Sequence, residues 1–277
     1  MSLYTLSGPL GQGKAVSTAG GGTALTTSAA TVLLPFGTRQ IDLSPRLFAG
    51  AAEVARFTKV PWLTVLKTTD LLAAIANMTD YSRNAQDGST STDVTLSGLD
   101  TLVNGDALYV GSFEPFLGVV VDVDAANSNA SVLTVEYRKS DDTWASITPT
   151  DGTDNAGAAF GQDGNVTWSE PSDWIARGLA DIVTTADPRL GSLFRIPQFW
   201  TRWTVSAALD ASSTLNSMVA MPRTTYAEIP AGMGWQEAVI CGPAAGPSIA
   251  GISALVDADT ASLVINAFAR NGGYIPS

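Results

Sequence analysis

Histidine is absent from the 277 residues, and cysteine occurs once, at position 241. Without histidine the chain lacks the side chain most often used as a general base near neutral pH, and a serine nucleophile would lack its usual partner. A single thiol forms no intrachain disulfide and no cysteine-based metal cluster. We therefore predict a protein that is not an enzyme, that needs no cofactor or metal, and that is stabilised by packing and oligomerisation.

Charged side chains are scarce as well. Fifteen Lys and Arg stand against 26 Asp and Glu, which gives a net charge of −11 with 15% charged residues. Binding to a phosphate backbone needs clustered lysine and arginine, so nucleic acid is not an expected partner. Residues 1–14 lack the basic start and apolar stretch of a signal peptide, and no run of about 18 apolar residues occurs, so neither export nor a membrane partner is expected.

Short runs of β-branched and aromatic residues dominate the middle of the chain. Between residues 107 and 221 they follow one another at roughly 10 to 15 residue spacing, with no amphipathic helix between them. This pattern is typical of an antiparallel sandwich rather than of βαβ units. We therefore predict a mainly β protein whose residues 107–221 form an antiparallel, jelly-roll-like β-sandwich.

The flanking regions are expected to form a second, smaller β-rich region and a C-terminal extension. Residues 31–106 combine short apolar runs with one short helix. The predicted helical residues are Leu71, Leu72, Ile75 and Met78, capped by Thr69 and Asp70. Residues 222–277 are expected to pack on a neighbour or on the N-terminal region, and their last apolar run, residues 261–268, fits either a strand or a helical turn.

Residues 1–30 are expected to form an extended N-terminal arm. The segment has almost no charge and no hydrophobic period, so it cannot build a core of its own, yet it keeps apolar side chains that a disordered tail normally lacks. An arm that orders against a neighbouring subunit fits this pattern better than a flexible tail, which is the alternative. The predicted interface residues of the arm are Leu3, Tyr4, Leu6 and Leu10.

The seven tryptophans could form a core or a binding surface. A β-sandwich buries tryptophan, whereas a carbohydrate-binding surface exposes it for stacking on sugar rings. Five of the seven lie within residues 107–221, which favours the core. Trp200 and Trp203 are three positions apart and point to opposite faces if they lie in a strand, so one of them is a candidate interface residue.

One loop carries several possible oxygen ligands for a hard cation: Asp122, Asp124, Asn127 and Asn129. An EF-hand loop has glycine at its sixth position, which is Asn127 here. Asp and Asn between strands more often hydrogen-bond to their own backbone. We therefore predict that this loop forms turns, and calcium binding is the alternative.

A series of short motifs runs through residues 107–221. In chain order they are Leu108-Tyr-Val-Gly-Ser112, Pro115-Phe116, Asn129-Ala-Ser-Val-Leu-Thr-Val-Glu-Tyr137, Thr143-Trp144, Thr150-Asp-Gly-Thr153, Val166-Thr-Trp168, Pro171-Ser-Asp-Trp174 and Phe199-Trp-Thr-Arg-Trp203. This region resembles a domain of structural proteins from the virions of tailed bacteriophages. The resemblance covers less than half of the chain, and Arg138-Lys-Ser-Asp-Asp142 stands where the family usually has a Trp-Asn-Gly type turn. It implies a β-sandwich that serves as an assembly module on a capsid or a tail, with no catalytic residues to carry over.

Composition and resemblance together predict a bacteriophage virion structural protein, first of all a cement or decoration protein at capsomer junctions on the capsid surface. The expected partners are the major capsid protein and copies of the chain itself, as a homotrimer, because these junctions have threefold character. A tail, baseplate or head-fibre component is the first alternative, and a carbohydrate-binding β-sandwich is the second. A more distant alternative is a glycoside hydrolase that uses Asp141, Asp142 or Asp173, since two nearby acids suffice for that reaction.

Overall fold

The computed structural model describes residues 4–8, 11–15, 23–34, 40–183, 187–193, 196–223, 227–231, 237–240 and 249–268. Within these residues the secondary structure is mainly β, and the strands pair antiparallel in four sheets. The prediction of a mainly β protein with antiparallel sheets is confirmed. No helix in the described part of the chain is long and apolar enough to cross a membrane.

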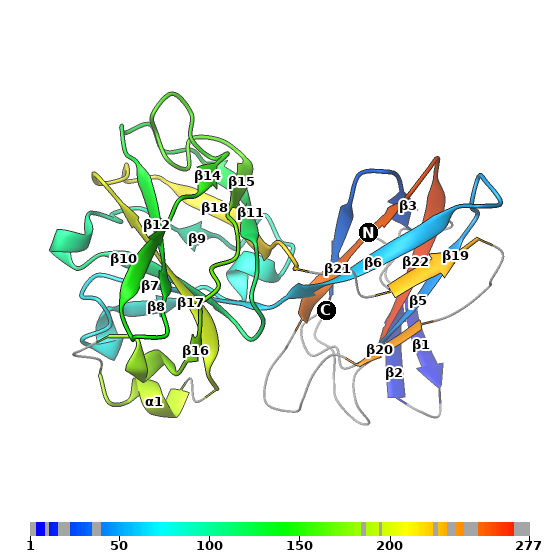
Figure 1. Ribbon diagram of the computed structural model, residues 1–277, viewed down its shortest axis with the longest axis horizontal. Helices are drawn as coiled ribbons and strands as arrows, with labels where there is room; N and C mark the ends of the chain where they lie inside the picture. The colour runs from blue at the N-terminus through cyan, green and yellow to red at the C-terminus, as the bar shows by residue number, and fades with distance from the viewer. Residues whose placement is uncertain are drawn as a thin grey trace. The chain divides into compact units, whose positions relative to one another are not determined.

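The chain divides into two compact units. Unit 1 comprises residues 1–60 and 224–277, and unit 2 comprises residues 61–223. Figure 1 shows strands from both ends of the chain, coloured blue and orange to red, side by side in unit 1. The N-terminal and C-terminal regions therefore build one unit together, and the middle of the chain builds the other.

Unit 1 contains two sheets. The larger has the order β1-β2-β22-β5-β20, and β3 pairs with the start of β22 while β2 pairs with its end. Its strands are β1 (Tyr4–Gly8), β2 (Gly11–Ala15), β3 (Thr23–Leu25), β5 (Gln40–Arg46), β20 (Glu237–Ile240) and β22 (Ala261–Phe268). The smaller sheet has the order β19-β6-β21-β4, with β4 (Ala30–Leu33), β6 (Val54–Pro61), β19 (Ala227–Pro230) and β21 (Ile249–Val256). Residues 261–268, which the sequence left open, are thus a strand.

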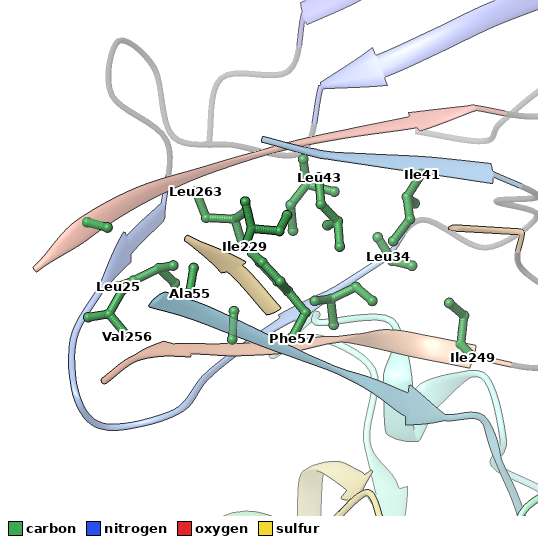
Figure 2. Packing of buried hydrophobic residues seen from close by; sticks show 14 residues of the cluster. Leu25, Leu34, Ile41, Leu43, Ala55, Phe57, Ile229, Ile249, Val256 and Leu263 are labelled. Carbon is green, nitrogen blue, oxygen red and sulfur yellow. The ribbon is translucent and has the colours of Figure 1, made fainter. Parts of the chain in front are cut away.

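The core of unit 1 lies between these sheets (Figure 2). Alternate residues such as Ile41 and Leu43, Ala55 and Phe57, and Leu263 and Ile265 point inward, as the two-residue period of a strand requires. The larger sheet supplies Leu25, Ile41, Leu43, Leu263 and Ile265, and the smaller sheet supplies Ala55, Phe57, Ile229, Ile252, Ala254 and Val256. Burial of each large side chain contributes about 1.5–3 kcal/mol, so this interdigitated layer holds the two sheets together.

Unit 2 also contains two sheets. The larger has the order β13-β12-β17-β10-β7-β8, with β16 paired to β17, and the smaller has the order β14-β15-β11-β18-β9. The larger sheet consists of β7 (Leu63–Thr68), β8 (Met78–Asp80), β10 (Ala107–Ser112), β12 (Leu133–Arg138), β13 (Trp144–Ile147), β16 (Ala176–Arg177) and β17 (Gln198–Val205). The smaller consists of β9 (Val94–Thr95), β11 (Gly118–Ala125), β14 (Thr150–Asp151), β15 (Gly164–Thr167) and β18 (Thr214–Ala220).

The start of unit 2 differs from the boundary expected at residue 107. Strand β7 pairs with β10 along the whole of β10, and β9 pairs with β18. Residues 61–106 therefore belong to the same unit as residues 107–223. This pairing could not be predicted from the sequence, because β7 and β9 are short and lie far along the chain from some of their partners.

Residues 69–78 do not form the predicted helix. Leu71 and Leu72 have φ angles of 55° and 66°, in the left-handed region that an α-helix excludes. Leu71 N donates to Gly105 O, and Asp187 N donates to Leu72 O, so hydrogen bonds to distant segments override the local helix propensity. The described helices are the 3₁₀ turns η1 (Ile75–Asn77), η2 (Asn84–Gln86), η3 (Leu102–Asn104) and η4 (Leu179–Asp181), and the α-helix α1 (Leu190–Leu193).

The contact between β10 and β17 can be tested at Gly111. A Cβ atom on Gly111 would lie 2.5 Å from Cε3 of Trp200, which is fully buried and has no room to move. We expect Gly111→Ala to lower the free energy of unfolding of unit 2 by about 1–3 kcal/mol, as overpacked cores do. Thermal unfolding followed by tryptophan fluorescence measures this, because six of the seven tryptophans lie in unit 2.

Gly191→Ala is the matched control for this substitution. Its Cβ would meet Ala180 Cβ at 3.6 Å, an ordinary van der Waals distance, so we expect a change within about 0.5 kcal/mol. Equal stability of the Gly111→Ala variant and the wild type would contradict the close packing of β10 on Trp200.

Candidate functional site

Both tryptophans expected to supply an interface residue are buried. Trp200 and Trp203 lie in β17 and point to opposite faces as predicted, but each is 0% exposed. Trp203 contacts Phe160 and Trp168 in the core of the sandwich, with ring centroids 6.4 and 6.2 Å away. Trp200 lies on the outer face, in a cluster that includes Leu179, Ile182 and Leu190. The expected interface role is corrected for both, because a segment of the same chain covers the face that was predicted to be free.

Within residues 1–30, the described strands pair with strands of their own chain. Strands β1 and β2 form a hairpin of five residue pairs, and residues 13–15 of β2 pair with residues 266–268 of β22. Leu3 and Leu10 lie outside the described residues, while Tyr4 and Leu6 belong to β1. The described residues 4–8 and 11–15 of the expected arm thus form a hairpin at the margin of a sheet of their own chain, and the contact of the arm with a neighbouring subunit stays a prediction.

The position of β1 leaves backbone groups of the hairpin available for pairing with another chain. Among the described strands, β1 has a neighbour on its β2 side alone, so it is an edge strand of the larger sheet of unit 1. An edge strand presents backbone N–H and C=O groups that can pair with another chain. Strand addition at such an edge is a common mode of protein–protein recognition.

A polar cluster lies on the outer face of the larger sheet of unit 2. The strand register places Tyr109 of β10 opposite Arg202 of β17, and Arg202 opposite Glu136 of β12. Arg202 Nη2 lies 2.7 Å from Glu136 Oε2, and Arg202 Nε donates to the same oxygen at 2.8 Å. The side chains of Arg202 and Glu136 are 12% and 18% exposed, so water screens this ion pair little, and removing one partner would leave a buried charge.

Trp144 completes what we call the Trp144 cluster: Tyr109, Glu136, Arg138, Trp144 and Arg202. Cζ of Arg138 lies 5.5 Å from the centroid of the Trp144 ring, and Cζ of Arg202 lies 4.8 Å from it. These distances fit cation–π attraction, which contributes about 0.5–2 kcal/mol per pair. The Tyr109 ring is 5.9 Å from that of Trp144.

Two hydrogen bonds attach the segment 179–183 to this cluster. Arg138 Nη2 donates to Asp181 O, and Trp144 Nε1 donates to Ile182 O, each at 3.2 Å. Leu179 and Ile182 of this segment belong to the hydrophobic cluster around Trp200. The Trp144 cluster therefore fixes the segment that covers the outer face of β17.

Burial alters the acid–base properties of two members of the cluster. It raises the pKa of Tyr109 to about 12, against the opposing effect of the nearby Arg202 guanidinium. It lowers the pKa of Arg138, against the opposing effect of Asp142, although a guanidinium stays protonated in a protein. The Tyr109 hydroxyl and Arg138 Nε have no hydrogen-bond partner among the described residues. A neutral phenol and permanent guanidinium charges suit packing and recognition rather than proton transfer.

The loop proposed as a set of turns or a calcium site is held by hydrogen bonds within unit 2. Asn129 N donates to Asn127 Oδ1 at 3.1 Å, the bond to the second residue onward that a turn-forming Asn makes, so the predicted turn is present at Asn127, whereas Asp122 and Asp124 lie in β11. Asp122 and Asp124 accept hydrogen bonds from side chains of β18. In the part of the chain that the structure describes, no three His, Cys, Asp or Glu residues are grouped so that they could hold a metal ion.

The three acids considered for glycoside hydrolysis make structural hydrogen bonds. Thr143 lowers the pKa of Asp141 through its side-chain and backbone hydrogen bonds, and a hydrogen bond from Arg177 lowers that of Asp142. A general acid in a glycosidase needs a raised pKa, so these shifts run in the wrong direction. Asp173 accepts a hydrogen bond of 2.7 Å from the Tyr137 hydroxyl.

The sequence analysis missed the Trp144 cluster because its members lie on four strands that are brought together by register. A signal was present in the sequence. Glu136 and Arg138 in β12, and Arg202 in β17, interrupt runs that otherwise have the composition of buried strands. Charged residues at such positions indicate a paired cluster, since an unpaired buried charge is costly.

No protein-family model and no curated protein sequence matches this chain. The functional assignment therefore depends on the residues and the geometry described above, together with the resemblance of residues 107–221.

Alkaline unfolding of a Tyr109→Phe variant tests the buried phenol. A folded-state pKa of about 12 exceeds the ordinary value of about 10, so between these pH values the unfolded chain has lost a proton that the folded chain keeps. Wild-type stability should fall as the pH rises through this window, by roughly 2–3 kcal/mol from Tyr109. The variant should show a shallower decline, and little change below pH 10, in urea unfolding followed by tryptophan fluorescence.

Tyr81→Phe, which removes a hydroxyl elsewhere in unit 2, is the control for this experiment. The same reduction in slope in both variants, or an unchanged slope in Tyr109→Phe, would contradict the burial of Tyr109 as the cause.

Proposed function

We propose that the chain is a non-enzymatic structural protein of a tailed-bacteriophage virion, and that it acts on the capsid surface as a cement or decoration protein. The main support for this proposal is the position in the fold of the motifs that resemble phage virion proteins. Leu108–Ser112 lie in β10, Val166 and Thr167 end β15 with Trp168 directly after it, and Phe199–Trp203 lie in β17. The motifs are thus strands and buried aromatic residues of the sandwich. Motifs that specify a fold rather than a reaction are expected of an assembly module.

The two units suit a subunit that joins neighbours. In unit 2 both faces of the larger sheet are covered, and aromatic side chains pack against one another in its core. Unit 1 carries an edge strand at which a neighbouring chain can add main-chain hydrogen bonds. A chain with two units can contact two subunits at once, and such linked binding strengthens attachment without new contacts. The proposed partners are the major capsid protein and copies of the chain itself in a trimer.

A tail, baseplate or head-fibre subunit would use the same physical properties and is the alternative within the virion. The carbohydrate-binding alternative has less support. Five of the six tryptophans within the described residues are buried. The sixth, Trp144, has the guanidinium groups of Arg138 and Arg202 over its ring, where a sugar would have to stack.

Deletion of residues 1–15 tests the assembly role of the β1–β2 hairpin. The hairpin joins the rest of the sheet through three residue pairs between β2 and β22 and contributes no strand to unit 2, so melting of unit 2 should not change. Incorporation of the truncated chain into phage particles should fall at least about tenfold, because the edge strand for pairing with a neighbour is lost. Quantitative blotting of purified particles measures incorporation.

A Val103→Ser variant is a suitable control, because Val103 is 95% exposed in unit 2 and lies outside the hairpin. It should be incorporated like the wild type. Normal incorporation of the truncated chain would show that the hairpin is not an assembly element, whereas absence of the full-length chain from particles would contradict the virion assignment itself.

A further inference from the structure

Within the described residues one asparagine is followed directly by glycine, at Asn104 and Gly105 in unit 2. Asn104 is the last residue of η3 and is exposed to solvent. In such a pair the backbone nitrogen of the glycine can attack the side-chain amide of the asparagine, because glycine has no side chain to hinder the approach. The pair is therefore a candidate site of spontaneous chemical modification.

The fold requires glycine at position 105. Gly105 has a φ angle of 89°, in the left-handed region that favours glycine, and a Cβ atom there would lie 3.0 Å from Thr69 O. Gly105 O also accepts a hydrogen bond of 2.8 Å from Leu71 N. The residue that makes Asn104 reactive is thus held in place by the packing of the neighbouring segment.

Two hydrogen bonds oppose the attack in the folded chain. Gly105 N donates to Leu102 O at 3.0 Å, so the nucleophilic nitrogen is engaged within η3. Asn104 Nδ2 donates to Asp100 Oδ2 at 2.6 Å, which fixes the amide. A single 3₁₀ turn at the surface opens locally at a small cost in free energy, and the attack requires this opening.

We propose that Asn104 is a site of spontaneous deamidation, that local opening of η3 limits its rate, and that the products weaken the packing of unit 2. The Gly105 nitrogen loses its proton to solvent and bonds to Cγ of Asn104, and the side-chain nitrogen leaves as ammonia, so that a cyclic succinimide forms. Water then opens the ring at either carbonyl carbon. The products are aspartate, or isoaspartate with one additional methylene in the main chain. This inference does not depend on the virion assignment.

Both products disturb contacts that the structure shows. Aspartate at this position places a carboxylate where the amide now donates to Asp100, so repulsion replaces attraction. Isoaspartate lengthens the main chain and displaces Gly105, whose carbonyl accepts from Leu71 N. The next residue, Leu72, is fully buried in the hydrophobic cluster around Trp200. The modification therefore affects the cover on the outer face of the larger sheet.

Peptide mapping by mass spectrometry of the full chain, incubated in mildly alkaline buffer, measures the reaction directly. The same chain in guanidinium chloride gives the rate of the unfolded pair, and the second Asn-Gly pair, at residues 271–272, provides an internal standard in that solvent. We expect deamidation at Asn104 in the native chain to be at least about tenfold slower than in denaturant, because opening must precede attack. Rates within about twofold of each other would contradict control by η3, and no product from the native chain after about a hundred unfolded half-lives would overturn the proposed site.

Asp100→Ala tests the hydrogen bonds that restrain η3. The Asp100 carboxylate accepts from Thr101 N and from Asn104 Nδ2, so its removal should accelerate native deamidation at Asn104 at least about threefold and leave the rate in denaturant unchanged. Asp87→Ala is the matched control, because it removes an exposed carboxylate that accepts hydrogen bonds within another loop of unit 2. The same native rate in Asp100→Ala and the wild type, or equal acceleration in both variants, would overturn the restraint by η3.

Asn104→Gln separates the effect of this site from deamidation elsewhere in the chain, because glutamine forms the corresponding larger ring far more slowly. The melting temperature of unit 2 in the incubated wild type should fall by at least about 2 °C as the products accumulate. Incubated Asn104→Gln should keep its own initial melting temperature while its other asparagines react as in the wild type. An equal fall in both proteins, or none in a fully converted wild type, would contradict the effect of the products on packing.

Discussion

Strand β17 carries a tryptophan on each of its faces, and the architecture of unit 2 depends on covering both. Trp203 is buried against Phe160 and Trp168 at the inner face, where the smaller sheet packs. Trp200 on the outer face needs a different cover, which Leu179, Ile182 and Leu190 provide. Arg138 and Trp144 hold this cover by hydrogen bonds to the backbone carbonyls of Asp181 and Ile182. The ion pair of Arg202 and Glu136 in turn places a guanidinium over Trp144.

The sequence predicted strands well wherever β-branched and aromatic residues alternate in runs, as in β10, β11, β12 and β17. It failed where tertiary contacts decide the conformation. The helical spacing after Thr69 is overridden by hydrogen bonds that hold Leu71 and Leu72 in left-handed conformations. Burial of Trp200 could not be foreseen either, because the covering segment has no strong hydrophobic period and its fixation depends on strand register.

Buried polar atoms without a hydrogen-bond partner among the described residues occur in both units. In unit 2 the acids of the loops accept hydrogen bonds from nearby side chains and backbone, as Asp141 and Asp210 do, and their pKa values are lowered accordingly. In unit 1 the buried Glu53 carboxylate lacks a partner among the described residues, and Leu47 is both strained and exposed. Departures of this kind reduce stability and are found mostly at surfaces with a function.

Electron cryomicroscopy of phage particles purified from cells that produce this chain tests the central claim most directly. The account predicts density for two joined β units, each with two antiparallel sheets, at the junctions between capsomers, with unit 1 in contact with a neighbouring subunit. Particles without such density, from which the chain is also absent by mass spectrometry, would contradict the assignment of this protein to the virion.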